Sequence, residues 1–426
     1  MKLLTRLARG SRIDDQVARR VVIAVCLSAF AEWGGSSAVL PLLPVYLHNR
    51  GSSVTLVGFT MAAFFAAAVL VQYPVGRLSD RIGRRTIQLA GLVTYSFATI
   101  LFVFVSAPLA ALLFRGLQGA GVGVVDVANA ATIGEVVPES QRGRAFGALY
   151  GTRTAGMAIA PFFGGLAGLG EMHWLFVAAA IAVLLAAVPI YLFAPRNRRR
   201  EPLRAHERTA LWRNRSVVGV GVAFLAGGIA VGMYEVCWSL LLTLRGARSW
   251  EIGLSWTLFA LPFAIVSLPA GWLVDHMDRR RLVIISLVGM AAFAGTYPWL
   301  HSVALLVGLG TGEAMTVALG GPAESAQLTR SVSSRELGRA QGAVSSMQTG
   351  AMAVSASIAG ALFGVRPWLP FMLAAGSMGV CVVVIGLVWR GVPGRGSAVP
   401  VRALHPALAA EDELSAPPGQ RVPTVL

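Results

Sequence analysis

The chain has 426 residues, of which 55% are hydrophobic and only 13% are charged. Soluble domains carry about 25% charged residues, so this composition excludes an ordinary soluble protein, and the mean hydropathy of +0.67 fits a chain built from membrane helices. A formal net charge of +16 would suit a nucleic-acid binder, but the basic residues are spread over separate loops rather than gathered in one patch.

Apolar runs of about 20 residues are long enough to cross a bilayer as helices, and they predict twelve membrane helices. In chain order, the first half has helices at 20–47, 54–75, 86–106, 108–136, 143–168 and 173–194. The second half has helices at 216–244, 249–271, 281–301, 303–329, 338–363 and 367–390. The first run is too long for the apolar part of a cleaved signal peptide, so we expect it to remain as a helix.

These runs divide the chain into five parts. They are a basic arm (1–19), a first six-helix bundle (20–194), a linker (195–215), a second six-helix bundle (216–390) and a tail (391–426). We expect the arginine-rich linker to lie on the membrane surface and the tail, rich in proline and small residues, to be disordered.

The two bundles carry the same short polar loop. The segment from Gly76 to Arg85 returns 195 residues later as the segment from Gly271 to Arg280. The same offset pairs further residues: Gly58 with Gly253, Pro74 with Pro269, Gly143 with Gly338, and Gly165 with Gly360. One ungapped shift that aligns so many positions indicates a duplicated membrane domain. Such duplications are typical of transporters, which bind substrate between the two halves.

The basic residues gather on one side of the predicted topology. The arm, the linker, the tail and alternate loops carry most of them. The opposite loops carry only Arg50, Arg245, Arg248 and Arg366, while Arg115 and Arg153 lie inside predicted helices. The positive-inside rule therefore places both termini in the cytoplasm. The positive charge indicates contact with anionic lipid headgroups rather than with nucleic acid.

Four motifs are specific enough to compare with known families. The segment from Gly76 to Arg85 reads G-x-x-x-D-x-x-G-R-R, and the segment from Arg115 to Gly121, in the fourth predicted helix, reads R-x-x-Q-G-x-G. The fifth predicted helix carries Gly147, Gly156, Pro161, Gly164 and Gly165, and the first carries Glu32, Pro41 and Pro44.

These motifs resemble those of the major facilitator superfamily and, within it, of the twelve-helix drug–proton antiporters. The fifth helix resembles the antiporter signature, with Ala160 where the family usually has glycine. Glu32, Pro41 and Pro44 have the spacing of an acidic residue and two prolines in tetracycline antiporters. The resemblance implies an all-α membrane fold of twelve helices in two pseudo-symmetric six-helix bundles.

The repeated loop is expected to act as a gate. The candidate gating residues are Gly76, Asp80, Gly83, Arg84, Arg85 and Glu135. Asp80 can accept hydrogen bonds from the start of a neighbouring helix, and Arg84 can pair with Glu135 at the end of the fourth helix. Such contacts can form in one state and break in the other. The alternative is that the arginines only fix the topology. The second copy has Asp278 in place of Gly83, which weakens the expectation there.

Four acidic residues inside predicted helices are the candidates for proton coupling. They are Glu32, Asp126, Glu235 and Glu313, in the first, fourth, seventh and tenth helices, which line the central cavity in this superfamily. A charge in lipid costs several kcal/mol, so these side chains should face a cavity or each other. We expect Glu32 to be the leading proton carrier, Glu313 the second, and Arg115 the charge partner of Glu32. Some acids could instead form structural ion pairs or bind a cationic substrate.

Other residues are candidates for the wall of a substrate cavity. Arg153 can neutralise Asp126 or meet an anionic group on the substrate. The aromatic candidates are Trp33, Tyr234, Trp238, Trp256 and Phe259, each of which could also serve in ordinary packing. We found no phosphate-binding glycine loop before a basic helix and no metal spacing among the six histidines, so we expect no cofactor, no bound metal and no enzyme activity.

We interpret the sequence as a cytoplasmic-membrane transporter that exports a small, drug-like organic compound in exchange for protons. The expected partners are that substrate, protons and the lipid bilayer, and the chain is expected to act as a monomer. One alternative is an exporter of a sugar, a siderophore or another endogenous metabolite. Another, of a different class, is a membrane sensor or scaffold that transports nothing, although the linker and tail are too short for a large fused domain.

Overall fold

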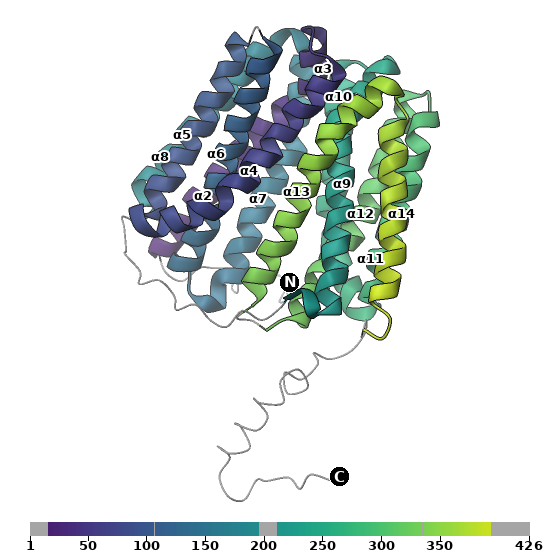
Figure 1. The fold of residues 1–426 in the computed structure, drawn as a ribbon. Coiled ribbons are helices and arrows are strands. Elements are labelled where there is room, and N and C mark those ends of the chain that lie inside the picture. Colours follow the sequence, from purple (N-terminus) through teal and green to yellow (C-terminus); the bar gives the residue numbers. More distant parts are fainter. Residues whose placement is uncertain (1–15, 106, 196–210, 334–335, 393–426) are drawn as a thin grey trace, which may run out of the picture.

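A computed structural model describes residues 16–105, 107–195, 211–333 and 336–392, and these residues are almost entirely helical. Most of the basic arm, most of the linker and nearly all of the tail lie outside the described residues. Figure 1 shows the long helices side by side, with the start of the first described helix and the end of the last one at the same end of the bundle.

Among the described residues, the first half contains seven α-helices, one of them short. They are α2 (Gln16–Val39), α3 (Leu43–Asn49), α4 (Val54–Ile82), α5 (Arg84–Leu101), α6 (Pro108–Val136), α7 (Glu139–Ala167) and α8 (Met172–Phe193). The second half contains α9 (Arg215–Leu244), α10 (Ser249–His276), α11 (Arg279–Thr296), α12 (Val303–Ser331), α13 (Leu337–Val365) and α14 (Leu369–Val388). Four 3₁₀ turns join them: η1 (Phe102–Phe104), η2 (Leu169–Glu171), η3 (Leu211–Arg213) and η4 (Tyr297–Trp299).

The predicted helix at 20–47 is wrong in one respect, because the structure divides it into α2 and α3. The break covers Leu40 to Leu42, and Pro44 lies in the first turn of α3. Pro41 has no backbone N–H to donate to the preceding turn, so the helix ends before it. Each of the other predicted runs corresponds to one long helix.

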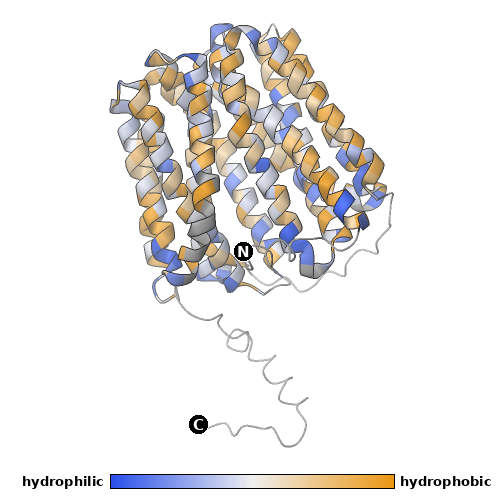
Figure 2. Ribbon diagram, turned by 180° about the vertical axis from the view of Figure 1, so that it is seen from behind, coloured by the Kyte–Doolittle hydropathy of each residue, from blue (hydrophilic) through white to orange (hydrophobic). Residues whose placement is uncertain are grey.

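The hydropathy and length of the helices indicate that the bundle spans a membrane. Among the described residues, ten helices are long and apolar enough to cross a membrane. The two long helices outside that set are α7 and α10, and α7 carries Arg142, Arg144 and Arg153 within its span. Figure 2 shows hydrophobic residues along the outer helices and hydrophilic residues gathered at their ends.

The two halves pack in the same way. In the first half α2 contacts α7 and α8, α4 contacts α6, and α5 contacts α6 and α8. In the second half α9 contacts α13 and α14, α10 contacts α12, and α11 contacts α12 and α14. These are the same five pairings after the 195-residue shift. The structure is therefore two pseudo-symmetric bundles, as the repeat predicts.

The halves meet where α4 crosses α13 and α7 crosses α10. A Cβ atom placed on Gly58 would lie 2.9 Å from the backbone nitrogen of Gly360, and one placed on Gly165 would lie 2.9 Å from the Cα atom of Gly253. Real Cβ atoms do not come this close to backbone, so any side chain would push the helices apart. These four glycines are two of the repeated pairs, so the duplicated sequence builds the same crossing twice.

Both glycine crossings lie near the same end of the bundle. Gly58 follows the start of α4, and Gly165 precedes the end of α7. The neighbouring α3 lies at the end opposite the start of α2 and the end of α14 (Figure 1). Backbone therefore meets backbone between the halves at the end of the bundle that carries α3.

The close packing of α6 against α4 predicts that one added methyl group destabilises the first half. Gly119→Ala should destabilise the protein by about 1–3 kcal/mol, because its Cβ atom would lie 2.7 Å from the Cα atom of Phe64 on α4. Thermal unfolding of the detergent-purified protein measures the change. Gly134→Ala on the same helix is the matched control, because nothing lies within 4 Å of its Cβ position. Equal stability of the two variants would contradict the close α4–α6 contact.

Candidate functional site

A cavity of about 220 Å³ lies between the two halves. Its wall comes from α2, α4, α6 and α7 on one side and from α9, α10, α12 and η4 on the other. All five aromatic candidates line it, namely Trp33, Tyr234, Trp238, Trp256 and Phe259. Three charged side chains also line it: Arg115, Glu235 and Glu313. An apolar wall with a few ionisable groups is the usual character of a small-molecule site.

Glu313 is held in place by two tyrosine hydroxyls. The hydroxyl of Tyr234 on α9 donates to Oε1 over 3.1 Å, and the hydroxyl of Tyr297 in η4 donates to Oε2 over 2.6 Å. The carboxyl is 1% exposed. The Tyr297 ring packs edge-on against Trp238 with centroids 4.9 Å apart, and the Trp238 indole N–H donates to Ser255 Oγ over 2.9 Å. The second half thus positions its buried acid through neutral hydrogen-bond donors.

Asp126 and Arg153 form an ion pair between α6 and α7. Arg153 Nη1 lies 3.2 Å from Asp126 Oδ1, and Nη2 donates to Oδ2 over 3.3 Å. The guanidinium also lies 4.2 Å from the centre of the Trp33 ring, a cation–π arrangement. The pairing matches the first of the two roles considered for Arg153.

Glu32 lies close to this pair but is not part of it. Its side chain is 1% exposed, and neither carboxylate oxygen has a hydrogen-bond partner within the part of the chain that the structure describes. The charges that act on it are those of Asp126 and Arg153. The first half therefore holds an acid in a buried position without a direct partner, which is unusual for a carboxyl group.

Arg115 does not make the contact with Glu32 that we expected. Its Nη1 donates to Gln118 Oε1 over 3.0 Å, and Gln118 Nε2 donates to Thr99 Oγ1 on α5 over 2.9 Å. The carboxylate that acts electrostatically on Arg115 is that of Glu235, across the cavity. The reason is local, because Gln118 lies one helical turn along the same face and takes up the guanidinium.

The expected gating residues surround the joint between α4 and α5. Arg84 Nη1 lies 2.6 Å from Glu135 Oε2 at the end of α6 and also donates to the carbonyl of Ala131. Arg85 lies 4.3 Å from the centre of the Tyr191 ring. The structure thus brings Arg84 and Glu135 together. Asp80 falls in the last turn of α4, and its side chain lies outside what is described.

The same joint differs between the two halves. Gly83 joins α4 to α5 with a φ of 96°, which favours glycine, while Gly76 has open space around it. In the second half Asp278 stands in place of Gly83 and caps α11 by accepting from the Arg280 backbone N–H over 2.9 Å. Burial raises the pKa of the Asp278 carboxyl, but hydrogen bonds and the charge of Arg280 outweigh it and keep the pKa below its usual range.

The fifth predicted helix is α7, and the residues of its antiporter signature contact two neighbouring helices, α2 and α10. A Cβ atom on Gly156 would lie 2.9 Å from the backbone nitrogen of Gly34 on α2. Gly164 meets α2 at Ala38, while Gly165 and the carbonyl of Pro161 meet α10 at Gly253. The signature glycines therefore place α7 tightly against both its own half and the other half.

Sequence reasoning missed several residues of the site. Tyr297 was missed because a tyrosine in a 3₁₀ turn has no helical spacing relative to Glu313. Gln118 was only quoted as part of a motif. Glu324, a second acid within the predicted helix at 303–329, was also overlooked, but it is not among the residues that line the central cavity.

Two similar bundles of membrane helices with buried ionisable groups around a cavity between them define a secondary transporter. The family model of the Major Facilitator Superfamily matches residues 25–250 and 238–418. The chain belongs to this superfamily. It is a multi-pass membrane transporter and not an enzyme.

Several relatives are drug-resistance proteins. The class G tetracycline resistance protein of Vibrio anguillarum is 28% identical over 334 residues, which cover 74% of this chain and 82% of the relative. The class H protein of Pasteurella multocida is 30% identical, covering 43% of this chain and 47% of the relative. The quinolone resistance protein NorA of Staphylococcus aureus is 25% identical, covering 40% and 44%. The chain spans about half the length of most of these relatives.

Solved structures share the fold at low sequence identity. A nucleoside transporter superposes with a TM-score of 0.72 at 14% identity, covering 87% of this chain and all of that one. A POT family transporter bound to a peptide conjugate superposes with a TM-score of 0.71 at 15% identity, covering 87% of this chain and 96% of that one. These likenesses support the fold alone.

The Asp126–Arg153 pair predicts a coupling energy. Asp126→Asn and Arg153→Gln should each destabilise the protein, because each leaves a partly buried charge without its partner. The double variant should be more stable than the sum of the two losses predicts, by about 1–3 kcal/mol. Unfolding of the three variants in parallel measures this coupling. Simple additivity would contradict a direct interaction.

Proposed function

We propose that this transporter exports a small, drug-like organic compound in exchange for protons. The observation that carries the proposal is the unpartnered, 1% exposed carboxyl of Glu32 beside the Asp126–Arg153 pair. We propose further that the chain sits in the cytoplasmic membrane with both termini inside, and that it acts as a monomer, because one chain supplies the whole wall of the cavity.

The proton is assigned to Glu32 on physical grounds. An ionised carboxylate in this position would be costly, because the side chain is buried and no described donor reaches its oxygens. The neutral, protonated form therefore suits this conformation. If the halves part and water reaches α2, water stabilises the ionised form of Glu32 and the proton leaves. Arg153 then becomes available to either Asp126 or Glu32, which offers a way to couple protonation to helix position.

Glu313 is the second candidate, and it differs from Glu32 in one important way. Two tyrosine hydroxyls donate to its oxygens, and such donors stabilise a carboxylate ion. Glu313 also lines the cavity directly, whereas Glu32 is not among the lining residues. This division favours Glu32 as the proton carrier and Glu313, with Glu235, as polar contacts for the substrate.

Alternating access would use the two glycine crossings. At Gly58–Gly360 and Gly165–Gly253 the halves approach each other through backbone atoms. Rocking of one half about the cavity would open these crossings and close the opposite end. Arg84 and Glu135, together with Asp80, Gly83 and Arg85, are proposed to favour one of the two states at the opposite end.

Transport into liposomes tests the function. Acid-inside vesicles containing the purified protein should accumulate a tetracycline- or quinolone-like compound as protons leave. A gradient of one pH unit supplies about 1.4 kcal/mol per proton, enough for roughly tenfold accumulation in one-for-one exchange. A protonophore should abolish the accumulation, and ATP should have no effect. Accumulation that follows sodium and ignores the pH gradient would rule out proton exchange.

Glu32→Gln separates binding from coupling within the same assay. Gln keeps the size of the side chain but cannot release a proton, so accumulation should fall to background while substrate exchange without a gradient persists. Glu171→Gln, at an exposed position in η2, is the matched control and should behave like the unmodified protein. Loss of coupling in Glu313→Gln but not in Glu32→Gln would move the carrier to the second half.

A further inference from the structure

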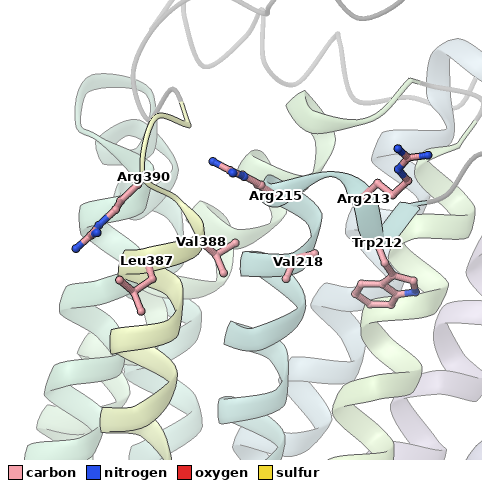
Figure 3. A pocket seen from close by; sticks show the side chains of 7 residues that line it. All are labelled: Trp212, Arg213, Arg215, Val218, Leu387, Val388 and Arg390. Carbon is pink, nitrogen blue, oxygen red and sulfur yellow. The ribbon is translucent and has the colours of Figure 1, made fainter.

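A groove of about 520 Å³ lies at the end of the bundle that carries the termini, apart from the central cavity. It runs between the start of α9, together with η3, and the end of α14. Seven residues line it: Trp212, Arg213, Arg215, Val218, Leu387, Val388 and Arg390. Figure 3 shows Arg215 reaching from α9 toward the α14 side of the groove.

The groove is strongly positive. Arg213, Arg215 and Arg390 are exposed, and no acidic residue lines the groove. Within the described ranges, none of the three guanidinium groups has an ion pair or a hydrogen bond. The start of α9 adds the partial positive charge of a helix N-terminus. Three exposed cations beside a helix N-terminus form a site that attracts an anion.

The neighbouring basic residue already has partners. Arg280 Nη2 donates to Asp278 Oδ2 over 3.0 Å, and Arg280 Nη1 donates to the carbonyl of Trp389 over 3.2 Å. The Trp389 indole N–H in turn donates to the carbonyl of Ser216 over 3.4 Å. Its ring fills the space over Gly219, where any side chain would collide with it. These contacts fasten the end of α14 to the start of α9, so the walls of the groove are fixed.

The floor of the groove is apolar and faces the surroundings of the bundle. Val218, Leu387 and Val388 form it, and Leu387 is 51% exposed. The Trp212 ring is 48% exposed and is turned along the helices, away from the guanidinium groups (Figure 3). Tryptophan of this kind is typical of the membrane–water interface. The site thus combines cations at its rim with apolar surface below them.

The first half does not repeat this arrangement. The 195-residue shift places Arg20 at the position of Arg215, but Ala18 and Pro195 at the positions of Arg213 and Arg390. Basic loops alone can fix the topology of the first half without this cluster.

We propose that the groove binds an anionic phospholipid, with the phosphate among the three arginines and an acyl chain along Val218 and Leu387. Arginine is well suited to a phosphate group because its planar guanidinium can donate two hydrogen bonds at once. The apolar floor favours a lipid over a free anion, because a small ion would leave that surface uncovered.

Lipid titration of the full chain in detergent tests this. Native mass spectrometry should show phosphatidylglycerol bound more tightly than phosphatidylethanolamine, which has no net charge. Arg215→Gln should weaken phosphatidylglycerol binding by roughly fivefold, and the triple variant Arg213→Gln, Arg215→Gln, Arg390→Gln by roughly a hundredfold. Arg20→Gln, the pseudo-symmetric and exposed control, should leave it unchanged.

Three results would overturn the proposal. Equal losses in Arg20→Gln and Arg215→Gln would show that only the overall charge matters. Equal binding of the two lipids would show that the groove does not select an anion. Displacement of phosphatidylglycerol by inorganic phosphate would make it a site for a free anion. Unchanged thermal unfolding of each variant verifies that the fold is intact, and the single variants decide the matter if the triple variant unfolds.

Discussion

Backbone contact between glycines sets how the two halves of this protein meet. At Gly58–Gly360 and Gly165–Gly253 the helices approach so closely that no side chain fits between them. Apolar side chains gain little by leaving lipid, so close backbone approach is a main source of attraction between membrane helices. Such a contact is made by main-chain atoms rather than by long side chains. Both crossings come from one ancestral pair, so they lie symmetrically about the cavity, and the ionisable groups lie between two surfaces that are able to part.

The two halves use different chemistry to hold their buried acids. The first half pairs Asp126 with Arg153 and leaves Glu32 without a hydrogen-bond partner among the described residues. The second half has no arginine at the position of Arg153, where the repeat places Gln348, and it surrounds Glu313 with tyrosine hydroxyls. The loss or gain of a nearby proton changes the electrostatic energy of a charged pair, and it changes the energy of neutral hydrogen-bond donors less. Duplication therefore supplied the symmetric frame, and divergence supplied the separate roles that we propose for proton and substrate.

Much of the architecture follows from the sequence, because the repeat and the apolar runs are patterns in the order of the residues. They predict the long helices and the partners Arg84 and Glu135, which lie near each other at neighbouring helix ends. The division of the first helix at Pro41 was missed, although proline gives the physical reason. The partner of Arg115 was wrong because a glutamine one turn away competes with a distant carboxylate. Tyr297 was not predicted because its contact with Glu313 depends on how η4 packs, and no periodic pattern records that. The proposed lipid groove likewise depends on tertiary packing, which brings Arg390 of the α14 end to the same groove as Arg213 and Arg215.

Distances between spin labels on α4 and α13 test the alternating-access account most directly. One labelled pair, Phe59→Cys with Ala361→Cys, lies beside the Gly58–Gly360 crossing, and another, Leu78→Cys with Gly338→Cys, lies toward the opposite ends of the same helices. Labels would be introduced after replacing the native cysteines Cys26, Cys237 and Cys381. As the pH is changed in the presence of substrate, the account predicts that the distance in one pair increases while the distance in the other decreases. Distances that stay fixed, or that change in the same direction at both ends, would contradict it.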